Sequence, residues 1–200
     1  MKYLLSFMLV WILVSAFSVL PDELSIGSTI PSPDLKMKDV TGKQYSFKDA
    51  SKKNGLLVVF SCNTCPWVIK NEQVADEAYR YALSKNVGVI LLNSNEAQRS
   101  GDDSQERMAG YAKEKKYKWP YVIDEQSFMA NAFGAKVTPE CYFFDKHMKP
   151  VYHGAITDNP KTPAESTRDH LKVAIDEVVE GKAVSQTTSK AMGCTIKRKS

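Results

Sequence analysis

The 200-residue sequence has little histidine and little excess charge. It contains three histidines and four cysteines, and its formal net charge is +4. A charge this small, spread along the chain, does not indicate a nucleic-acid-binding protein. The densest basic segment, residues 113–118, closes an expected helix, where cations suit the helix dipole. The small charge therefore predicts no nucleic-acid partner. Three histidines offer few metal ligands, so we also predict no resident metal.

The sequence also lacks internal repeats and low-complexity segments. Hydrophobic residues make up 43% and charged residues 25% of the chain, which is typical of a globular domain rather than a disordered one. Two hundred residues suffice for one domain with its own core and are too few for two. We predict one domain over residues 26–182, followed by a polar C-terminal tail, residues 183–200, that carries Cys194.

The first twenty residues form a separate segment. One early lysine, an apolar run and the small residues Ser15, Ala16 and Ser18 precede Pro21. This pattern predicts a secretory signal peptide over residues 1–20, cleaved near Ser18. The alternative is an uncleaved N-terminal membrane anchor, since the run reaches the lower limit of about 18 residues for a span. Either way we expect export to the periplasm or the extracellular space, where disulfides persist.

The remainder alternates strand patterns with helix patterns. The expected elements, in chain order, are a β-hairpin (35–47), a strand (56–60), a helix (66–86), a strand (87–93), a helix that starts near 103 with a capping box to Glu106, a strand (121–124), a short helix (126–134), two strands (140–145 and 150–156) and a last helix (164–180). This order predicts an α/β fold with a mixed central β-sheet, flanking helices and an N-terminal β-hairpin extension.

Cys62 and Cys65 form a C-x-x-C-P motif directly after the apolar strand at 56–60. We expect Cys62 at or just before the start of a helix, with Cys65 one turn inside. Unpaired N–H groups and the helix dipole stabilise an anion there, and thiol pKa values in such settings fall from about 8.5 towards roughly 3.5–7.5. We predict a redox pair in which Cys62 attacks and Cys65 resolves the mixed disulfide. A static disulfide and a Cu(I) site with a histidine are the alternatives.

Several ordered landmarks resemble one protein family. The strand, C-x-x-C-P and helix arrangement resembles the thioredoxin superfamily. Residues 26–49 resemble the entry segment of its redoxin branch, the alkyl hydroperoxide reductase/thiol-specific antioxidant proteins, and residues 121–145 resemble that branch's segment containing Thr138-Pro139. The ending MGCTIKRK is similar to a peroxiredoxin-like subgroup that ends in G-C-x-I-K. The resemblance covers about residues 26–199.

The resemblance implies a thioredoxin fold and a thiol–disulfide oxidoreductase without an organic cofactor. It implies a cis peptide bond at Thr138-Pro139 beside the cysteines, where the loop positions an extended peptide substrate. Its partners would be protein thiols or disulfides and an upstream redox partner; the membrane is a partner only if the N-terminal segment is not cleaved.

Two other functions stay open. A thiol peroxidase of the same fold would have Thr three residues before its reactive cysteine; here Cys62 stands there before Cys65, and Val59 before Cys62. A non-enzymatic Cu(I) carrier would need a histidine near the thiolates.

The other two cysteines have less certain surroundings. Cys141 lies two residues after Pro139, on the same strand face, and is either a small core residue or a neighbour of the pair from below. Cys194 lies in a short apolar patch of the tail. We hypothesise that the tail folds back, and that Cys194 is a third redox thiol or pairs with Cys141. Trp67, Tyr117 and Trp119 are either core residues or the lining of a partner groove.

Overall fold

The computed structural model describes residues 23–199. The predicted leader, residues 1–20, therefore lies outside the described residues. Within the described part, none of the helices has the length and apolar character needed to cross a membrane.

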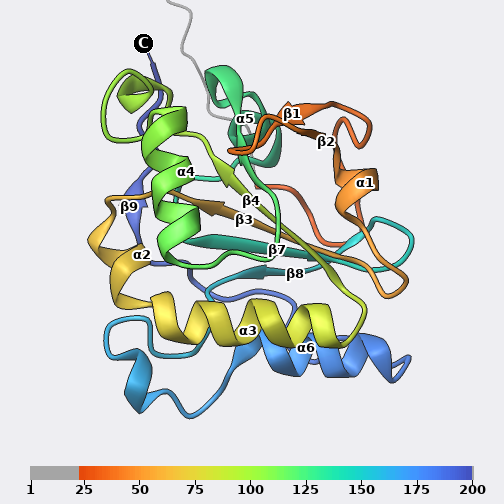
Figure 1. Ribbon diagram of the computed structural model, residues 1–200. Coiled ribbons are helices and arrows are strands. Elements are labelled where there is room, and N and C mark those ends of the chain that lie inside the picture. Colours follow the sequence, from red (N-terminus) through yellow and green to blue (C-terminus); the bar gives the residue numbers. More distant parts are fainter. Residues whose placement is uncertain (1–22, 200) are drawn as a thin grey trace, which may run out of the picture.

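The centre of the molecule is a five-stranded mixed sheet with helices on both faces (Figure 1). The strand order is β5-β4-β3-β7-β8; β3, β4 and β5 are parallel, and β7 is antiparallel to both of its neighbours. The sheet strands are β3 (Leu56–Ser61), β4 (Gly88–Asn93), β5 (Tyr121–Ile123), β7 (Glu140–Phe144) and β8 (Pro150–Gly154). This arrangement confirms the predicted mixed α/β class.

Six α-helices and three short 3₁₀ segments are described. The helices are α1 (Phe47–Ala50), α2 (Pro66–Lys70), α3 (Glu72–Ser84), α4 (Gln105–Glu114), α5 (Phe128–Phe133) and α6 (His170–Val179). The 3₁₀ segments are η1 (Glu96–Gln98), η2 (Glu125–Ser127) and η3 (Pro163–Glu165). Two small antiparallel pairs complete the fold: β1 (Met37–Lys38) with β2 (Gln44–Tyr45), the predicted hairpin, and β6 (Val137–Thr138) with β9 (Cys194–Thr195).

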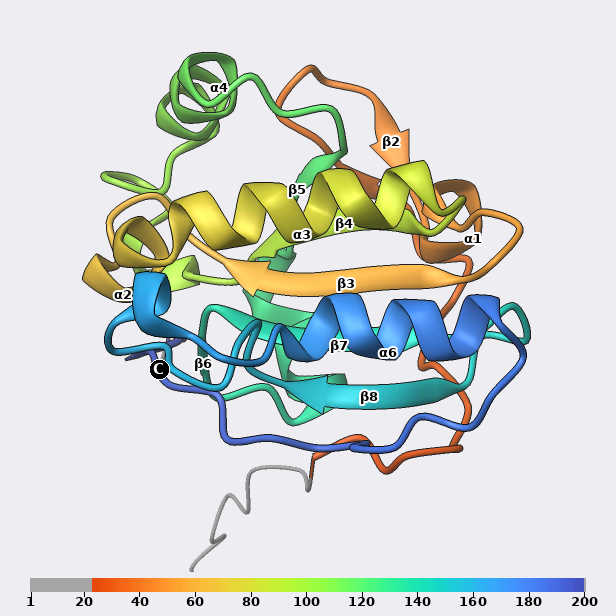
Figure 2. The ribbon, with the colours of Figure 1, turned by 90° about the horizontal axis from the view of Figure 1, so that it is seen from below.

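Each face of the sheet buries its own core. Helices α3 and α6 run side by side across one face (Figure 2). Alternate residues of a strand point to opposite faces, so Leu57 and Val59 of β3 pack on this side, and Val58 and Phe60 pack on the side of α1 and α5. Every residue of β3 is buried, which explains why its sequence is a continuous apolar run.

An aromatic cluster fixes α5 and the segment that follows it. The ring of Phe133 lies 5.1 Å from that of Tyr142 and 5.4 Å from that of Phe60, both edge-on. Aromatic pairs in such geometry contribute about 0.5–1.5 kcal/mol beyond area burial. Gly134, with φ +64°, ends α5 in the left-handed conformation that glycine favours. This left-handed residue turns the chain from α5 towards β6.

Three predicted helices begin or break at other residues in the structure, and one residue that was predicted in a strand lies in a helix. The helix from Pro66 is broken at Asn71, whose side-chain amide donates to Trp67 O and Pro160 O. Helix α4 begins at Gln105 with Ser104 as its N-cap, because Asp103 is buried in a hydrogen-bond network. The last helix begins only at residue 170, since Asp169 caps it. Phe47 lies in α1, not in the hairpin.

The C-terminal tail folds back on the domain, as hypothesised. Strand β9 pairs with β6, with Cys194 opposite Thr138. Ile196 is buried in the core on the α5 side of the sheet. A side chain at Gly193 would meet the carbonyl oxygen of Thr138 at 2.1 Å, so only glycine allows this close approach. Figure 1 shows β9 beside α2.

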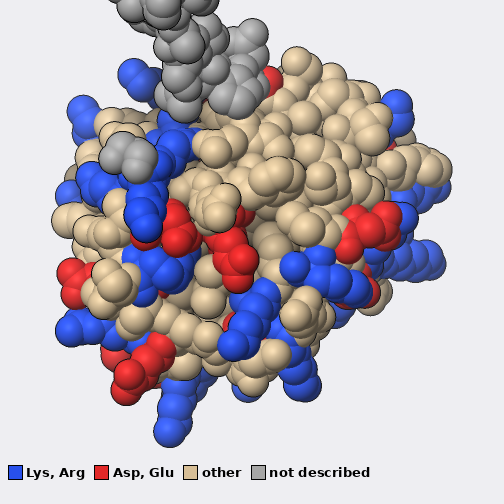
Figure 3. All heavy atoms as spheres, turned by 90° about the horizontal axis from the view of Figure 1, so that it is seen from above, with Lys and Arg blue, Asp and Glu red and all other residues tan. Residues whose placement is uncertain are grey.

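Charged side chains of both signs are interspersed over the face that carries the hairpin and α5 (Figure 3). A broad part of that face is uncharged.

Candidate redox site

Cys65, rather than Cys62, is the residue at the helix start. Helix α2 begins at Pro66, and Cys65 is its N-cap, with φ −67° and ψ 121°. A residue before proline is pushed out of the helical region into the extended one, so Pro66 prevents the helix from starting earlier. Cys62 lies between the end of β3 and the cap. The predicted placement of Cys62 at the helix start and Cys65 one turn inside was therefore wrong.

Both sulfurs of the pair contact Thr138. Cys65 Sγ lies 3.2 Å from the carbonyl oxygen of Thr138, and Cys62 Sγ lies 3.4 Å from Thr138 Oγ1. The two cysteines are only 2% and 3% exposed. The Thr138-Pro139 peptide bond is cis, as the resemblance implied. The structure therefore brings these four predicted site residues together.

Hydrogen bonds shift the pKa values of the two cysteines in opposite directions. The hydrogen bond from the Cys62 thiol is the largest cause of the lowered pKa of Cys65; hydrogen bonds from the Cys194 thiol and the backbone N–H of Val68 add to it, and together they outweigh burial and lower this pKa to about 4. The same hydrogen bond, then burial, raises the pKa of Cys62, and the carboxylate of Asp103 adds to the increase. These shifts favour ionisation of Cys65 over ionisation of Cys62.

A buried polar network lies behind Cys62 and was not predicted from the sequence. Asp103 is fully buried; its Oδ1 accepts from Asn63 N at 3.1 Å and from Asn93 Nδ2 at 2.7 Å, and its Oδ2 accepts from Asn95 Nδ2 at 2.9 Å. The Tyr121 hydroxyl donates to Asn63 Oδ1 at 2.9 Å. This network holds the backbone between the two cysteines. Its only sequence signal is the polar cluster at residues 93–95 directly after a buried strand.

A second buried group supports the Thr138 segment from the other side. Glu140 Oε2 accepts from the amides of Lys136 and Val137 at 2.8 and 3.0 Å, and its Oε1 lies 2.7 Å from His153 Nε2. Burial opposes ionisation, but these hydrogen bonds outweigh it and leave the pKa of Glu140 below its ordinary value. The carboxylate therefore fixes β6, and with it Thr138.

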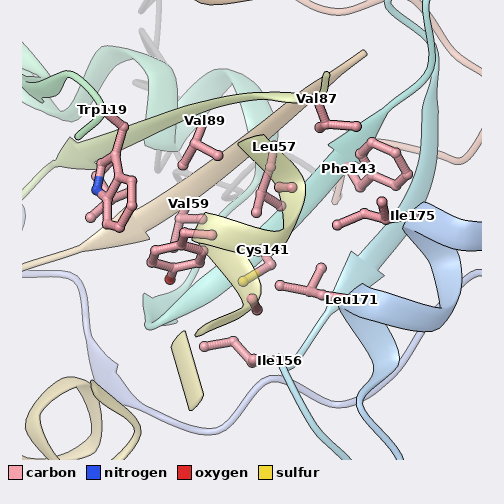
Figure 4. Packing of buried hydrophobic residues seen from close by; sticks show 14 of the residues in the cluster. Leu57, Val59, Val87, Val89, Trp119, Cys141, Phe143, Ile156, Leu171 and Ile175 are labelled. Carbon is pink, nitrogen blue, oxygen red and sulfur yellow. The ribbon is translucent and has the colours of Figure 1, made fainter. Parts of the chain in front are cut away.

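Cys194 joins the pair, whereas Cys141 does not. Cys194 packs against the cluster formed by Cys62, Cys65 and Val68, beside a hollow of about 190 Å³ lined by all three cysteines. Cys141 is fully buried among core residues such as Leu57 and Leu171 (Figure 4). Burial, as the first cause, raises its pKa. All four cysteines are free thiols here, and the hypothesised pairing of Cys141 with Cys194 finds no support in this placement.

A wider groove of about 540 Å³ borders the site at Pro139. Tyr111, Tyr117 and Trp119 line it. The Tyr111 hydroxyl and Trp119 Nε1 are buried without a hydrogen-bond partner among the described residues. Trp67 packs instead against the cysteine cluster. Tyr117 and Trp119 thus serve both as core residues and as groove lining.

Comparisons with known proteins agree with this architecture. The redoxin family model matches residues 26–171. The thiol-disulfide oxidoreductase ResA of Geobacillus thermodenitrificans is 24% identical over 151 residues, which are 74% of this chain and 78% of ResA.

Solved structures extend the similarity to nearly the whole chain. An uncharacterized conserved protein from Geobacillus kaustophilus is 31% identical, with a TM-score of 0.78 over 91% of this chain and 94% of that one. A hypothetical protein from Sinorhizobium meliloti 1021 is 28% identical, with a TM-score of 0.81 over 90% and 97% of the two chains. The thioredoxin domain of a Bacteroides vulgatus thiol-disulfide oxidoreductase, at 20% identity and a TM-score of 0.55 over 72% of this chain and 97% of that one, shares the fold. The predicted thioredoxin fold is confirmed.

Proposed function

The chain belongs to the redoxin family and is a thiol–disulfide oxidoreductase, and from this premise we propose that Cys62 and Cys65 are its redox pair, which exchanges disulfides with protein substrates outside the cytoplasm. The observation that carries the proposal is the geometry of the two sulfurs. They lie between a buried strand and a helix start, and both contact Thr138, the residue before the cis proline.

We propose that the two cysteines have the reverse of the roles that the sequence predicts. Because hydrogen bonds lower the pKa of Cys65 and raise that of Cys62, Cys65 attacks and Cys62 resolves in this proposal. The Cys65 thiolate attacks one sulfur of a substrate disulfide, a mixed disulfide forms, and the other substrate sulfur leaves as a thiolate that takes up a proton. Cys62 then loses its proton and attacks Cys65 Sγ. The Cys62–Cys65 disulfide forms, the second substrate sulfur is released, and two electrons have passed to the substrate.

The stabilised thiolate also bears on the direction of electron flow. A low thiol pKa stabilises the reduced form and makes the pair a better oxidant. Known pairs run from about −270 mV for a reductant to about −120 mV for a strong oxidant. We expect a potential well above the lower value, measured by equilibration of the full chain with glutathione.

Thr138 and Pro139 are proposed to position the substrate. Thr138 contacts both sulfurs through its side chain and its carbonyl oxygen. The groove beside Pro139 would receive substrate side chains next to the scissile disulfide. Export through the leader at residues 1–20 belongs to the same proposal, and fractionation of cells that express the full chain tests it.

The two alternatives lack a supporting observation. The position three residues before Cys65 is occupied by Cys62, so no threonine hydroxyl is supplied there for a peroxide. For a Cu(I) carrier, none of the three histidines lines the hollow around the cysteines. His147 lies in the turn between β7 and β8, His153 bonds Glu140, and His170 begins α6.

Trapping experiments test the proposal. Cys62→Ser and Cys65→Ser should each lower turnover of insulin or a dithiol peptide by more than about 100-fold, since the pair acts as a unit. With Cys194 also replaced by Ser, the Cys62→Ser protein should accumulate a mixed disulfide with substrate, and the Cys65→Ser protein should not. Cys141→Ala is the matched control and should retain turnover. Wild-type turnover in either single variant would refute the redox pair.

A further inference from the structure

The tail holds the sulfur of Cys194 in a fixed place beside the pair. Cys194 lies opposite Thr138 in the β6–β9 ladder, and Thr138 is the residue that both Cys62 and Cys65 contact. The cysteine therefore reaches the site through an ordered strand.

The residues after Cys194 anchor this strand to three other segments. Ile196 N donates to Lys136 O at 3.0 Å, and Lys197 N donates to Asn95 Oδ1 at 2.8 Å. The Arg198 guanidinium donates to Asn131 Oδ1 at 2.7 Å and to Ala135 O at 2.6 Å. These four acceptor atoms outside the tail fix its register. A C-terminal segment that only contacted solvent would not form these hydrogen bonds.

Cys194 is also the sulfur of the cluster that solvent reaches most easily. Cys62 and Cys65 are buried, whereas Cys194 is partly exposed. Strand β9 pairs with β6 at Thr138, and Cys194 lines the same hollow as Cys62 and Cys65. A substrate that enters this hollow therefore meets Cys194 together with the pair.

We propose that Cys194 is a third redox cysteine, which exchanges its disulfide directly with Cys65 and connects the buried pair to outside thiols. The inference rests on the proposed Cys62–Cys65 couple. In the exchange, Cys194 gives up its proton, and its thiolate attacks Cys65 Sγ of the Cys62–Cys65 disulfide. The Cys65–Cys194 bond forms, the Cys62–Cys65 bond breaks, and Cys62 leaves as a thiolate that takes up the proton. No net oxidation occurs, so no further oxidant is needed.

Disulfide mapping of the Cys62→Ser full-length protein tests this exchange. The reduced protein is treated with oxidised glutathione, free thiols are blocked, and the non-reduced peptides are mapped by mass spectrometry. Cys65 attacks glutathione disulfide and releases one glutathione thiolate; Cys194 then displaces the second glutathione from Cys65. A thiol held in contact reacts at an effective concentration far above millimolar, so the Cys65–Cys194 linkage should exceed glutathione-bound Cys65 by about tenfold or more.

A variant that moves the tail but keeps its sulfur provides the second test. In the Cys62→Ser background, Gly193→Ala places a methyl group against the carbonyl oxygen of Thr138, which displaces β9. The ratio of the Cys65–Cys194 linkage to glutathione-bound Cys65 should fall about tenfold, as the effective concentration is lost. Gly110→Ala is the matched control, because no atom lies within 4 Å of the added Cβ, and it should leave the ratio unchanged.

The outcomes separate this inference from the proposed function. Glutathione that remains on Cys65 while Cys194 is blocked as a free thiol overturns the role of Cys194. In that case the wild-type protein would still form the Cys62–Cys65 disulfide, and the proposed function stands. Absence of the Cys62–Cys65 disulfide in the oxidised wild-type protein would overturn both.

Discussion

Two cysteines that stand three positions apart in the sequence have pKa values that shift in opposite directions. Cys65 caps α2 and receives hydrogen bonds from neighbouring thiols, whereas the negative charge of Asp103 adds to the raised pKa of Cys62. The two pKa shifts have a common cause, because the proton that Cys62 retains forms the hydrogen bond that lowers the pKa of Cys65. The nearby thiol of Cys194 adds a further donor.

The thiolate of Cys65 should be visible in a pH titration. In the reduced protein, absorbance at 240 nm should show one thiolate with a midpoint near pH 4, since the pKa of Cys65 is lowered to about 4 from its ordinary 9.0. Below that pH the sulfur is protonated, and the reaction of Cys65 with iodoacetamide should slow. Cys65→Ser should remove the transition. A first midpoint near pH 8 or 9 would refute the assignment.

Cys141 should affect stability and not catalysis. It is fully buried in the core between the sheet and helices α3 and α6. Cys141→Ser buries a hydroxyl there and should lower the free energy of unfolding of the reduced protein by about 1–3 kcal/mol, whereas Cys141→Ala should cost about 1 kcal/mol. Urea denaturation measures both values. A folded Cys141→Ala protein without turnover would show that this residue takes part in the reaction.

Among the elements, two short ones determine the site. Helix α2 is only five residues long, and Pro66 sets where it begins. Strand β6 is two residues long and is held by Glu140 on one side and by β9 on the other. Neither could form in isolation, since short helices and single pairs of strands are marginal in water. Their surroundings therefore decide the positions of Cys65 and Thr138.

Glu140→Gln should loosen β6 in a pH-dependent manner. The carboxylate is buried and accepts hydrogen bonds from two backbone amides and from His153, and loss of its charge should cost about 1.5–3 kcal/mol. Its pKa in the folded protein lies below the ordinary 4.5. The ionised group therefore stabilises the fold above pH 4.5, and this stabilisation is lost as the pH falls through the lower folded value.

Urea unfolding of wild type and Glu140→Gln between pH 3 and 7 measures this difference. The gap in unfolding free energy should be constant above about pH 5 and should close below pH 4.5. Glu106→Gln, on the exposed side of α4, is the matched control and should show no such gap. Equal gaps at pH 3 and pH 7 would contradict a role for the Glu140 charge.

At the scale of the whole molecule, the thiolate couples redox state to stability. The folded protein lowers the pKa of Cys65 and the unfolded chain does not, so the reduced fold is stabilised by on the order of 2–4 kcal/mol at neutral pH. The oxidised protein has no such term. Since the disulfide of the oxidised protein contributes a term of its own that does not depend on this pKa, the reduced protein should gain resistance to urea relative to the oxidised one as the pH rises from 4 to 7.

This difference should depend on pH in a defined direction. The stabilisation is complete above the unfolded pKa near 9 and is lost as the pH falls through the folded pKa of about 4. Urea midpoints of both redox forms at pH 4 and pH 7 measure this pH dependence. Cys65→Ser is the control, because it has neither the Cys65 thiolate nor the Cys62–Cys65 disulfide. A stability difference between the two redox forms that is equal at pH 4 and pH 7 would contradict the lowered pKa of Cys65.

The sequence by itself determined the fold class and singled out the two cysteines that we propose as the redox pair. Continuous apolar runs predict buried strands, and Cys62, Cys65 and Pro66 stand directly after one of them, because a motif at a strand end is a local pattern. The Thr138-Pro139 segment followed from family resemblance. The hairpin and the order of the strands along the chain also follow from local periodicity.

Only the tertiary structure decided which cysteine holds the charge and which other residues share the site. Cys194 reaches Cys65 from 129 positions away, and Asp103 and Glu140 act from separate elements. Burial, hydrogen-bond partners and the start of α2 set the proton distribution, and each depends on contacts between segments far apart in the chain. Sequence periodicity does not reveal such contacts. The cysteine pair could therefore be predicted from the sequence, whereas the residues that surround it could not.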